Sequence, residues 1–161
     1  MAFIHQRSGL LQNRPDADLI VPGLYQGSIP PFGYALREAG FDALVLCAQE
    51  HQDASKYPGV EVIECPLDDA RRFPNPSEWE TAREVAWRVR NILCHGGRVL
   101  VTCMAGKNRS GLVTALSLHC LTGVSGAVCS WFVKDRRKGA EALTNPYFVL
   151  ALERVPAWET T

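Results

Sequence analysis

A cysteine and an arginine separated by five residues mark the segment of this chain whose residue types are best suited to chemistry. The sulfur of Cys103 is a nucleophile in its thiolate form, and the planar guanidinium of Arg109 can bind two oxygens of one oxyanion. Between them stands Gly106, which permits an unusual backbone turn, with neither a proline nor a carboxylate. The segment is therefore suited to hold a phosphate-like anion against a thiolate.

The same spacing recurs at Cys65 and Arg71, but the residues between these two are unsuited to an anion. Pro66 lacks the backbone N–H that would donate to an anion, and the carboxylates of Asp68 and Asp69 would repel one. Spacing alone is thus a weak signal. We place anion binding in the loop that follows Cys103.

The elements on either side of that loop explain how it would be positioned. Residues 98–102 form a short apolar run that indicates a strand, and residues 109–121 are apolar nearly all round, which indicates a central helix. A loop that leaves a strand and opens a helix directs backbone N–H groups and the helix dipole at an anion. The same environment favours the thiolate of Cys103, and Ser110 is placed to hydrogen-bond its sulfur.

Strand and helix patterns alternate along the rest of the chain. Strands are predicted at 19–21, 24–26, 43–47 and 60–64, with a tight turn at Pro22 and Gly23. Helices are predicted at 32–39, at 78–95 behind a capping box from Ser77 to Glu80, from a Ser125 cap to 138, and from 146 to about 158. The pattern predicts one three-layer α/β/α domain over 19–161, with a central, mostly parallel mixed sheet of about four to five strands, after an irregular arm at 1–18.

Composition argues against several classes of protein. Among the 161 residues, 17 Lys and Arg balance 17 Asp and Glu, so a protein that binds DNA by bulk charge is not expected. No apolar run approaches the roughly 20 residues of a membrane helix. The six cysteines lack zinc-finger spacing, and a chain of this size needs no disulfide scaffold, which favours a reducing compartment. We expect a cytoplasmic monomer.

The segment from Cys103 to Ser110 resembles the phosphate loop of the cysteine-dependent protein tyrosine phosphatases, in particular their small dual-specificity branch. The similarity extends in consistent order over about residues 19–155. It includes the segments 24–28, 43–47 and 65–69, then Arg136, and finally the run that begins at Asn145 and Pro146. The loop motif is specific, whereas each flanking match is weak by itself.

The resemblance implies a role for each matching residue. Cys103 would attack phosphorus and become a phosphocysteine, while Arg109 and the N–H groups of residues 104–109 would hold the phosphate oxygens. Asp69 would be the general acid and then the base that activates water, Ser110 would assist departure of the thiolate, and Asn145 would brace the loop. The residues implied to bind phosphate are Met104, Ala105, Gly106, Lys107, Asn108 and Arg109. No metal or other cofactor is implied.

Two of these assignments have an alternative, and one position departs from the family pattern. Asp68 competes with Asp69 for the acid role, although the resemblance places the acid three residues after the proline. Asn145 is explained equally well as a helix N-cap. Thr102 stands where the family usually has a histidine before the nucleophile, so Cys103 has lost a charged partner. The basic run Lys134, Arg136, Arg137 and Lys138 is interpreted as a solvated helix end that suits the helix dipole.

The resemblance implies a phosphomonoester hydrolase whose partner is a phosphorylated protein, carrying phosphotyrosine and also phosphoserine or phosphothreonine. Lys107 is an extra cation, and a lysine at this position of the loop resembles the phosphoinositide phosphatases. An asparagine before the arginine, as at Asn108, instead resembles the RNA 5′-triphosphatases. A binding module that no longer turns over is the alternative from another class, and the presence of Cys103 and Asp69 argues against it.

Cys47 is a candidate redox partner for Cys103. Both cysteines end a predicted strand, and neighbouring parallel strands lie about 5 Å apart, within the reach of a disulfide. The alternative, which the sequence slightly favours, is that Cys47 only packs in the core.

Overall fold

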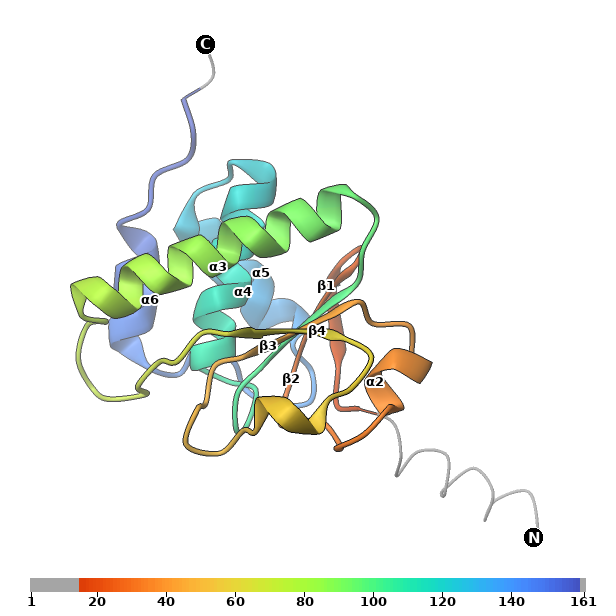
Figure 1. Ribbon diagram of the computed structural model, residues 1–161. Coiled ribbons are helices and arrows are strands. Elements are labelled where there is room, and N and C mark those ends of the chain that lie inside the picture. The colour runs from red at the N-terminus through yellow and green to blue at the C-terminus, as the bar shows by residue number, and fades with distance from the viewer. Residues whose placement is uncertain (1–14, 160–161) are drawn as a thin grey trace, which may run out of the picture.

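The computed structural model describes residues 15–159 and centres on a five-stranded sheet (Figure 1). The strands are β1 (Asp18–Val21), β2 (Leu24–Gly27), β3 (Ala43–Leu46), β4 (Glu61–Glu64) and β5 (Val99–Thr102). Their order in space is β1-β2-β5-β3-β4; β1 runs antiparallel to β2 and the other pairs are parallel. The predicted mostly parallel mixed sheet, in a single α/β domain, is confirmed.

Helices cover the two faces of this sheet unequally (Figure 1). The larger layer contains α3 (Pro76–Cys94), α4 (Arg109–Thr122), α5 (Gly126–Arg136) and α6 (Pro146–Glu153). Within residues 15–159, the other face carries only α2 (Ala35–Glu38) and a 3-10 turn, η1 (Ala54–Lys56). Along β3, Ala43 and Val45 pack toward the large layer, whereas Leu44 and Leu46 join the smaller cluster around Phe41. This alternation is what a strand buried on both faces requires.

The start of α3 differs from the sequence prediction. The cap is Asn75 rather than Ser77, because the Asn75 side chain accepts a hydrogen bond from Glu78 N at 2.8 Å and Asn75 N donates to the Glu78 carboxylate at 3.0 Å. Pro76 then occupies the first helical position, where its missing N–H costs nothing. The predicted capping box was therefore placed two residues too late.

Three other helices are shorter than predicted. The first, α2, is a single turn, because Gly33 adopts φ +93°, a left-handed conformation that no α-helix contains. The prediction that α5 reaches residue 138 is wrong because its helical hydrogen bonding ends at Arg136. The prediction that the last helix reaches 158 is also wrong: α6 ends at Glu153, since Pro156 cannot continue a helix.

The predicted arm at 1–18 lies mostly outside the described residues. Within the described part, Asp18 begins β1 and its carboxylate accepts hydrogen bonds from Lys138 N and Gly139 N. None of the helices in residues 15–159 is both long enough and apolar enough to cross a membrane.

The parallel strands bring three loops to one edge of the sheet. Leu46 pairs with Thr102 on one side and with Glu64 on the other. The residues that follow, Cys47, Cys103 and Cys65, therefore leave the sheet in one row. Loops at the carboxyl ends of parallel strands are where α/β folds place their binding sites.

Candidate active site

The loop from Cys103 to Arg109 joins β5 to α4 as the sequence predicted. Cys103 is buried, and its Sγ lies 3.2 Å from Ser110 Oγ. Arg109 opens α4 with 8% of its surface exposed. Within residues 15–159, no backbone N–H of residues 104–109 donates a hydrogen bond to another protein group. The loop therefore combines a thiol, a buried guanidinium and a set of backbone donors without protein acceptors.

Gly106 fixes the shape of this loop. Its φ of +67° is a left-handed conformation, and a Cβ there would lie 2.5 Å from both Gly27 C and Arg137 Nη2. Its carbonyl accepts hydrogen bonds from Gln26 Nε2 at 3.1 Å and from Arg137 Nε at 3.0 Å. The loop is therefore held in place from behind at a position where only glycine fits.

Arg137 is one of the two supports behind the loop, and its interpretation as part of a solvated helix end was wrong. Its side chain is fully buried and donates to Asp16 and Asp18 at 2.7 to 2.8 Å. Burial alone would lower the pKa of Arg137, but the hydrogen bonds and charges of these two carboxylates raise it. Since α5 ends at Arg136, the chain leaves the helix at this residue and Arg137 reaches the loop.

Gln26 is the other support and was not singled out in the sequence as a site residue. It is fully buried on β2, and its Nε2 also donates to Ser110 Oγ at 3.3 Å. A buried amide is expected to find hydrogen-bond partners inside the protein; Nε2 has two, whereas Oε1 has none among residues 15–159. That pattern was a usable signal, because Leu24 and Gln26 lie on the same face of the strand.

Glu50 pairs with Arg109 and was likewise not predicted to be a site residue. It lies in the loop after β3, and its Oε1 accepts a hydrogen bond from Arg109 Nη1. This hydrogen bond and the nearby positive charge lower the pKa of Glu50. Burial alone would lower the pKa of Arg109, but Glu50 raises it. The Nε of Arg109 is buried without an acceptor among residues 15–159.

The two candidate acids differ in what they contact. The carboxylate of Asp69 accepts hydrogen bonds from Asn108 Nδ2 at 3.2 Å and from Asn145 Nδ2 at 3.0 Å. The carboxylate of Asp68 instead pairs with Arg72 at 3.4 Å. Since Asn108 belongs to the phosphate loop, the structure brings Asp69 to that loop, whereas Asp68 is tied to the following segment.

The side chain of Asn145 caps α6 and contacts the loop that carries Asp69, rather than the phosphate loop that it was expected to brace. Its Oδ1 accepts a hydrogen bond from Tyr147 N at 3.0 Å, which caps α6, and its Nδ2 also donates to Ala70 O at 3.0 Å. Its backbone N donates to Asn108 Oδ1 at 2.8 Å. The side chain thus braces the loop that carries Asp69, and the backbone contacts the phosphate loop.

The hydroxyl of Thr102 is committed to groups other than Cys103. Its Oγ1 donates to Val45 O at 2.8 Å and accepts from Gln52 Nε2 at 2.9 Å. Gln52 in turn accepts from Ala48 N through its Oε1 at 2.9 Å. Thr102 therefore ties β5 to β3 and to the loop that carries Glu50.

The remaining predicted phosphate-loop residues lie at the protein surface. Met104, Ala105 and Lys107 are exposed, and Asn108 is half-buried. Lys107 contributes its backbone carbonyl, which accepts from Leu143 N at 3.1 Å. The extra cation that the sequence offered, Lys107, is therefore exposed at the surface of the loop.

Cys47 is fully buried beside the loop. Burial, followed by the neighbouring Cys65 thiol, raises the pKa of Cys47 well above its usual range, and Cys103 contributes in the same direction. Cys47 and Cys103 follow the paired residues Leu46 and Thr102 on neighbouring strands, and neither forms a disulfide within the described residues. The proposed pairing remains a prediction.

The whole fold matches solved phosphatase structures. Human DUSP28 superimposes with a TM-score of 0.68 at 24% identity, covering 87% of this chain and 92% of that one. The active form of Tk-PTP gives 0.69 at 25% identity, covering 88% of this chain and 99% of that one. The chain has the fold of the dual-specificity phosphatases.

A third match to that phosphatase fold is a mouse putative dual specificity phosphatase complexed with zinc tungstate. It gives a TM-score of 0.69 at 24% identity, covering 87% of both chains. No protein-family model matches the sequence, and no curated protein matches it significantly. The resemblance inferred from the sequence is thus confirmed at the level of the fold.

Proposed function

We propose that this protein is a cysteine-dependent phosphomonoester hydrolase. The observation that carries the proposal is the loop at residues 104–109, between the Cys103 thiol and the buried Arg109, whose backbone N–H groups have no acceptor within residues 15–159. An oxyanion bound there accepts hydrogen bonds from these N–H groups and from the Arg109 Nε–H. That Nε–H also has no acceptor in the described chain. Such a preorganised set of donors stabilises the charge of phosphoryl transfer.

In the first step, the Cys103 thiolate forms a bond to phosphorus while the bond from phosphorus to the ester oxygen breaks. Asp69, in its protonated form, donates its proton to that oxygen, so the alcohol leaves neutral. Arg109 and the loop amides hold the three other phosphate oxygens. Asn108 and Asn145 position the Asp69 carboxyl at the mouth, where it is exposed to solvent and substrate.

In the second step, water attacks the phosphocysteine, and Asp69, now a carboxylate, accepts a proton from that water. The bond from sulfur to phosphorus breaks and the electron pair returns to Cys103. Ser110 Oγ, 3.2 Å from the sulfur, donates a hydrogen bond to the departing thiolate. Free phosphate leaves, and both Cys103 and Asp69 regain their starting forms after proton exchange with solvent.

A phosphorylated protein is the substrate class that we favour. The exposed loop residues Met104, Ala105 and Lys107 form an open mouth that a protein chain can approach. The Asn108 side chain is committed to Asp69 and Thr144, which argues against direct contact with a nucleotide. Exposed Lys107 favours a phosphoinositide as the second candidate, because its ammonium group can serve an additional phosphate.

The test compares turnover of an aryl phosphate by the wild type, Cys103→Ser and Cys94→Ser. Cys94 is exposed at the end of α3, so its replacement is a matched control. We expect loss of activity only in Cys103→Ser; phosphatase activity retained in that variant would contradict the proposal. A panel of phosphotyrosine peptide, phosphothreonine peptide, phosphoinositide and RNA 5′-triphosphate then identifies the substrate. Lys107→Ala should weaken phosphoinositide turnover more than peptide turnover if that lipid is the substrate.

A further inference from the structure

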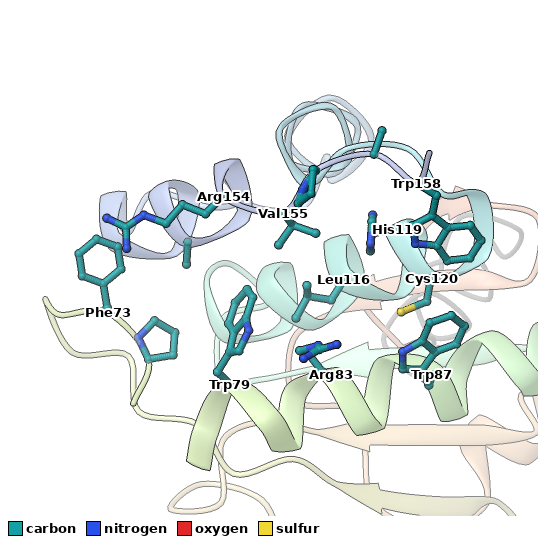
Figure 2. A pocket seen from close by; sticks show the side chains of 14 residues that line it. Phe73, Trp79, Arg83, Trp87, Leu116, His119, Cys120, Arg154, Val155 and Trp158 are labelled. Atoms are coloured by element: carbon teal, nitrogen blue, oxygen red, sulfur yellow. The ribbon is translucent and has the colours of Figure 1, made fainter. Parts of the chain in front are cut away.

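A cavity of about 570 Å³ lies between α3, α4 and the segment that follows α6 (Figure 2). It reaches α4 at Leu116, His119 and Cys120, roughly two to three turns beyond Arg109. No residue of the phosphate loop lines it. Its volume is within the range of about 300–1,000 Å³ that small-molecule sites occupy. The cavity is therefore separate from the proposed catalytic site.

Flat aromatic side chains line this cavity. Trp79, Arg83 and Trp87 are spaced four residues apart on α3, so they line one face of that helix and point into the cavity (Figure 2). The Trp158 ring stacks on Trp87 with centroids 5.8 Å apart and planes 10° from parallel. Aromatic faces arranged in this way favour a planar ligand that can stack or meet them edge to face.

Two guanidinium groups give the cavity a positive charge. Arg83 and Arg154 both line it, and its lining residues in the described chain include no aspartate or glutamate. Arg154 forms no ion pair and no side-chain hydrogen bond within residues 15–159; it lies over the Phe73 ring, 4.4 Å from the centroid. Arg83 has only the exposed Glu80, at 3.9 Å, as an ionic partner. Both arginines therefore retain donors for an anion.

His119 adds a polar group to the same wall. It is half-buried on α4, and its Nδ1 lies 2.7 Å from Val124 O. Because a carbonyl only accepts, Nδ1 carries the proton of this hydrogen bond. The ring meets Trp158 edge-on, with centroids 5.8 Å apart.

We infer that this cavity binds a flat aromatic compound carrying one anionic group, a carboxylate, sulfonate or phosphate. The ring system stacks among Trp79, Trp87 and Trp158, and the anion accepts hydrogen bonds from Arg83 or Arg154. A neutral compound of the same shape lacks the hydrogen bonds to arginine, whereas a small inorganic anion cannot stack on the tryptophans. The combination of an aromatic body and a negative charge thus defines the ligand class.

The test uses anilinonaphthalene sulfonate as the probe and wild-type protein with labelled indole N–H groups. The four tryptophans are Trp79, Trp87, Trp131 and Trp158, and Trp131 on α5 lies outside the cavity. In nuclear magnetic resonance titrations we expect one probe molecule per chain and saturating shifts of the three cavity indoles, with Trp131 unchanged. Absence of saturable binding, or equal shifts of Trp131, would overturn the inference.

The charge requirement is tested with variants and a neutral analogue. Arg83→Gln or Arg154→Gln, whichever removes the donor to the anion, should weaken sulfonate binding by about threefold or more, and unchanged affinity in both variants would refute the anion site. Arg88→Gln, on the same helix but outside the cavity, should leave affinity unchanged. Neutral phenylnaphthylamine should bind more weakly than the sulfonate and respond to none of these changes. Equal affinity of the two probes for the wild type would refute the anion site.

Discussion

The Nδ2 of Asn145 donates a hydrogen bond to the Asp69 carboxylate across 3.0 Å, while the Oδ1 of the same side chain caps α6. One residue therefore fixes both the start of a helix and the orientation of the proposed general acid. Asn108 of the phosphate loop donates to the other carboxylate oxygen. The acid loop and the anion loop are thus connected through two amide side chains.

Replacing the proposed acid should change how the rate depends on the leaving group. Asp69→Asn removes the proton donor, so turnover of an alkyl phosphate should fall by roughly 10²-fold or more, while an activated aryl phosphate loses much less. Steady-state rates over a series of leaving groups measure this. Asp68→Asn, which loses the contact with Arg72, is the matched control and should retain the wild-type dependence. The reverse pattern would assign the acid to Asp68.

The two functions of Asn145 should separate in two variants. Asn145→Ser keeps an N-cap oxygen but cannot reach Asp69, so stability should change little while turnover of poor leaving groups falls. Asn145→Ala should lose about 1 kcal/mol of stability in addition. Urea unfolding and leaving-group series provide the two readouts. If Asn145→Ser shows wild-type leaving-group dependence, Asn145 acts only as a helix cap.

Arg137 should stabilise the protein and the phosphate loop together. Arg137→Gln removes donors to Gly106 O and to two partly exposed carboxylates, and losing such charged hydrogen bonds costs about 1–3 kcal/mol. We expect a lower urea midpoint and weaker phosphate binding. Arg136→Gln, one residue earlier and half-exposed, is the control and should stay close to the wild type. Equal effects of the two substitutions would contradict a specific role for Arg137.

The same cluster should make stability sensitive to acid. Hydrogen bonds from Arg137 lower the pKa of Asp16. Burial alone would raise the pKa of Asp18, but hydrogen bonds from backbone N–H groups and from Arg137 lower it. The unfolded chain therefore binds more protons near pH 4, so this stabilisation is complete above the unfolded pKa and is lost as pH falls through the lowered folded values. The variant with Asp16→Asn and Asp18→Asn should be less stable at pH 7 and show a flatter acid limb than Asp135→Asn. Parallel acid limbs would exclude this origin.

Cys47 should protect Cys103 from irreversible oxidation. Peroxide converts the Cys103 thiolate to a sulfenic acid, and the Cys47 thiol then displaces water to form a disulfide. Peptide mapping should find the linked pair, and dithiothreitol should restore activity. Cys47→Ser should lose this recovery, whereas the exposed Cys94→Ser should keep it. Reversible inactivation that persists in Cys47→Ser would leave Cys47 with a packing role only.

The local sequence was sufficient for the parts of the site that lie close together in the chain. The strand, the turn at Gly106 and the helix from Arg109 follow from residue types within one short segment. Asp69 was preferred over Asp68 because the family resemblance places the acid three residues after the proline, and Asp69 is the one that contacts Asn108.

The supports from distant segments were harder to predict, for physical reasons. Glu50 reaches Arg109 only because the loop after β3 crosses the edge of the sheet, and loop paths are not encoded in hydrophobic periodicity. Arg137 looks like its charged neighbours until the helix end places it behind the loop. The predicted bounds of α2 and α6 were too wide because a glycine delays the start of α2 and a proline ends α6 before the apolar pattern does.

The phosphocysteine intermediate is the most direct test of the proposed chemistry. Ser110→Ala removes the donor to the departing thiolate, so an aryl phosphate should load the enzyme faster than water unloads it. Rapid acid quench with a radiolabelled aryl phosphate, followed by peptide mapping, should place one phosphoryl group per chain on Cys103. A stoichiometric burst with the label on any other residue, or turnover without a labelled enzyme in this variant, would contradict nucleophilic catalysis by Cys103.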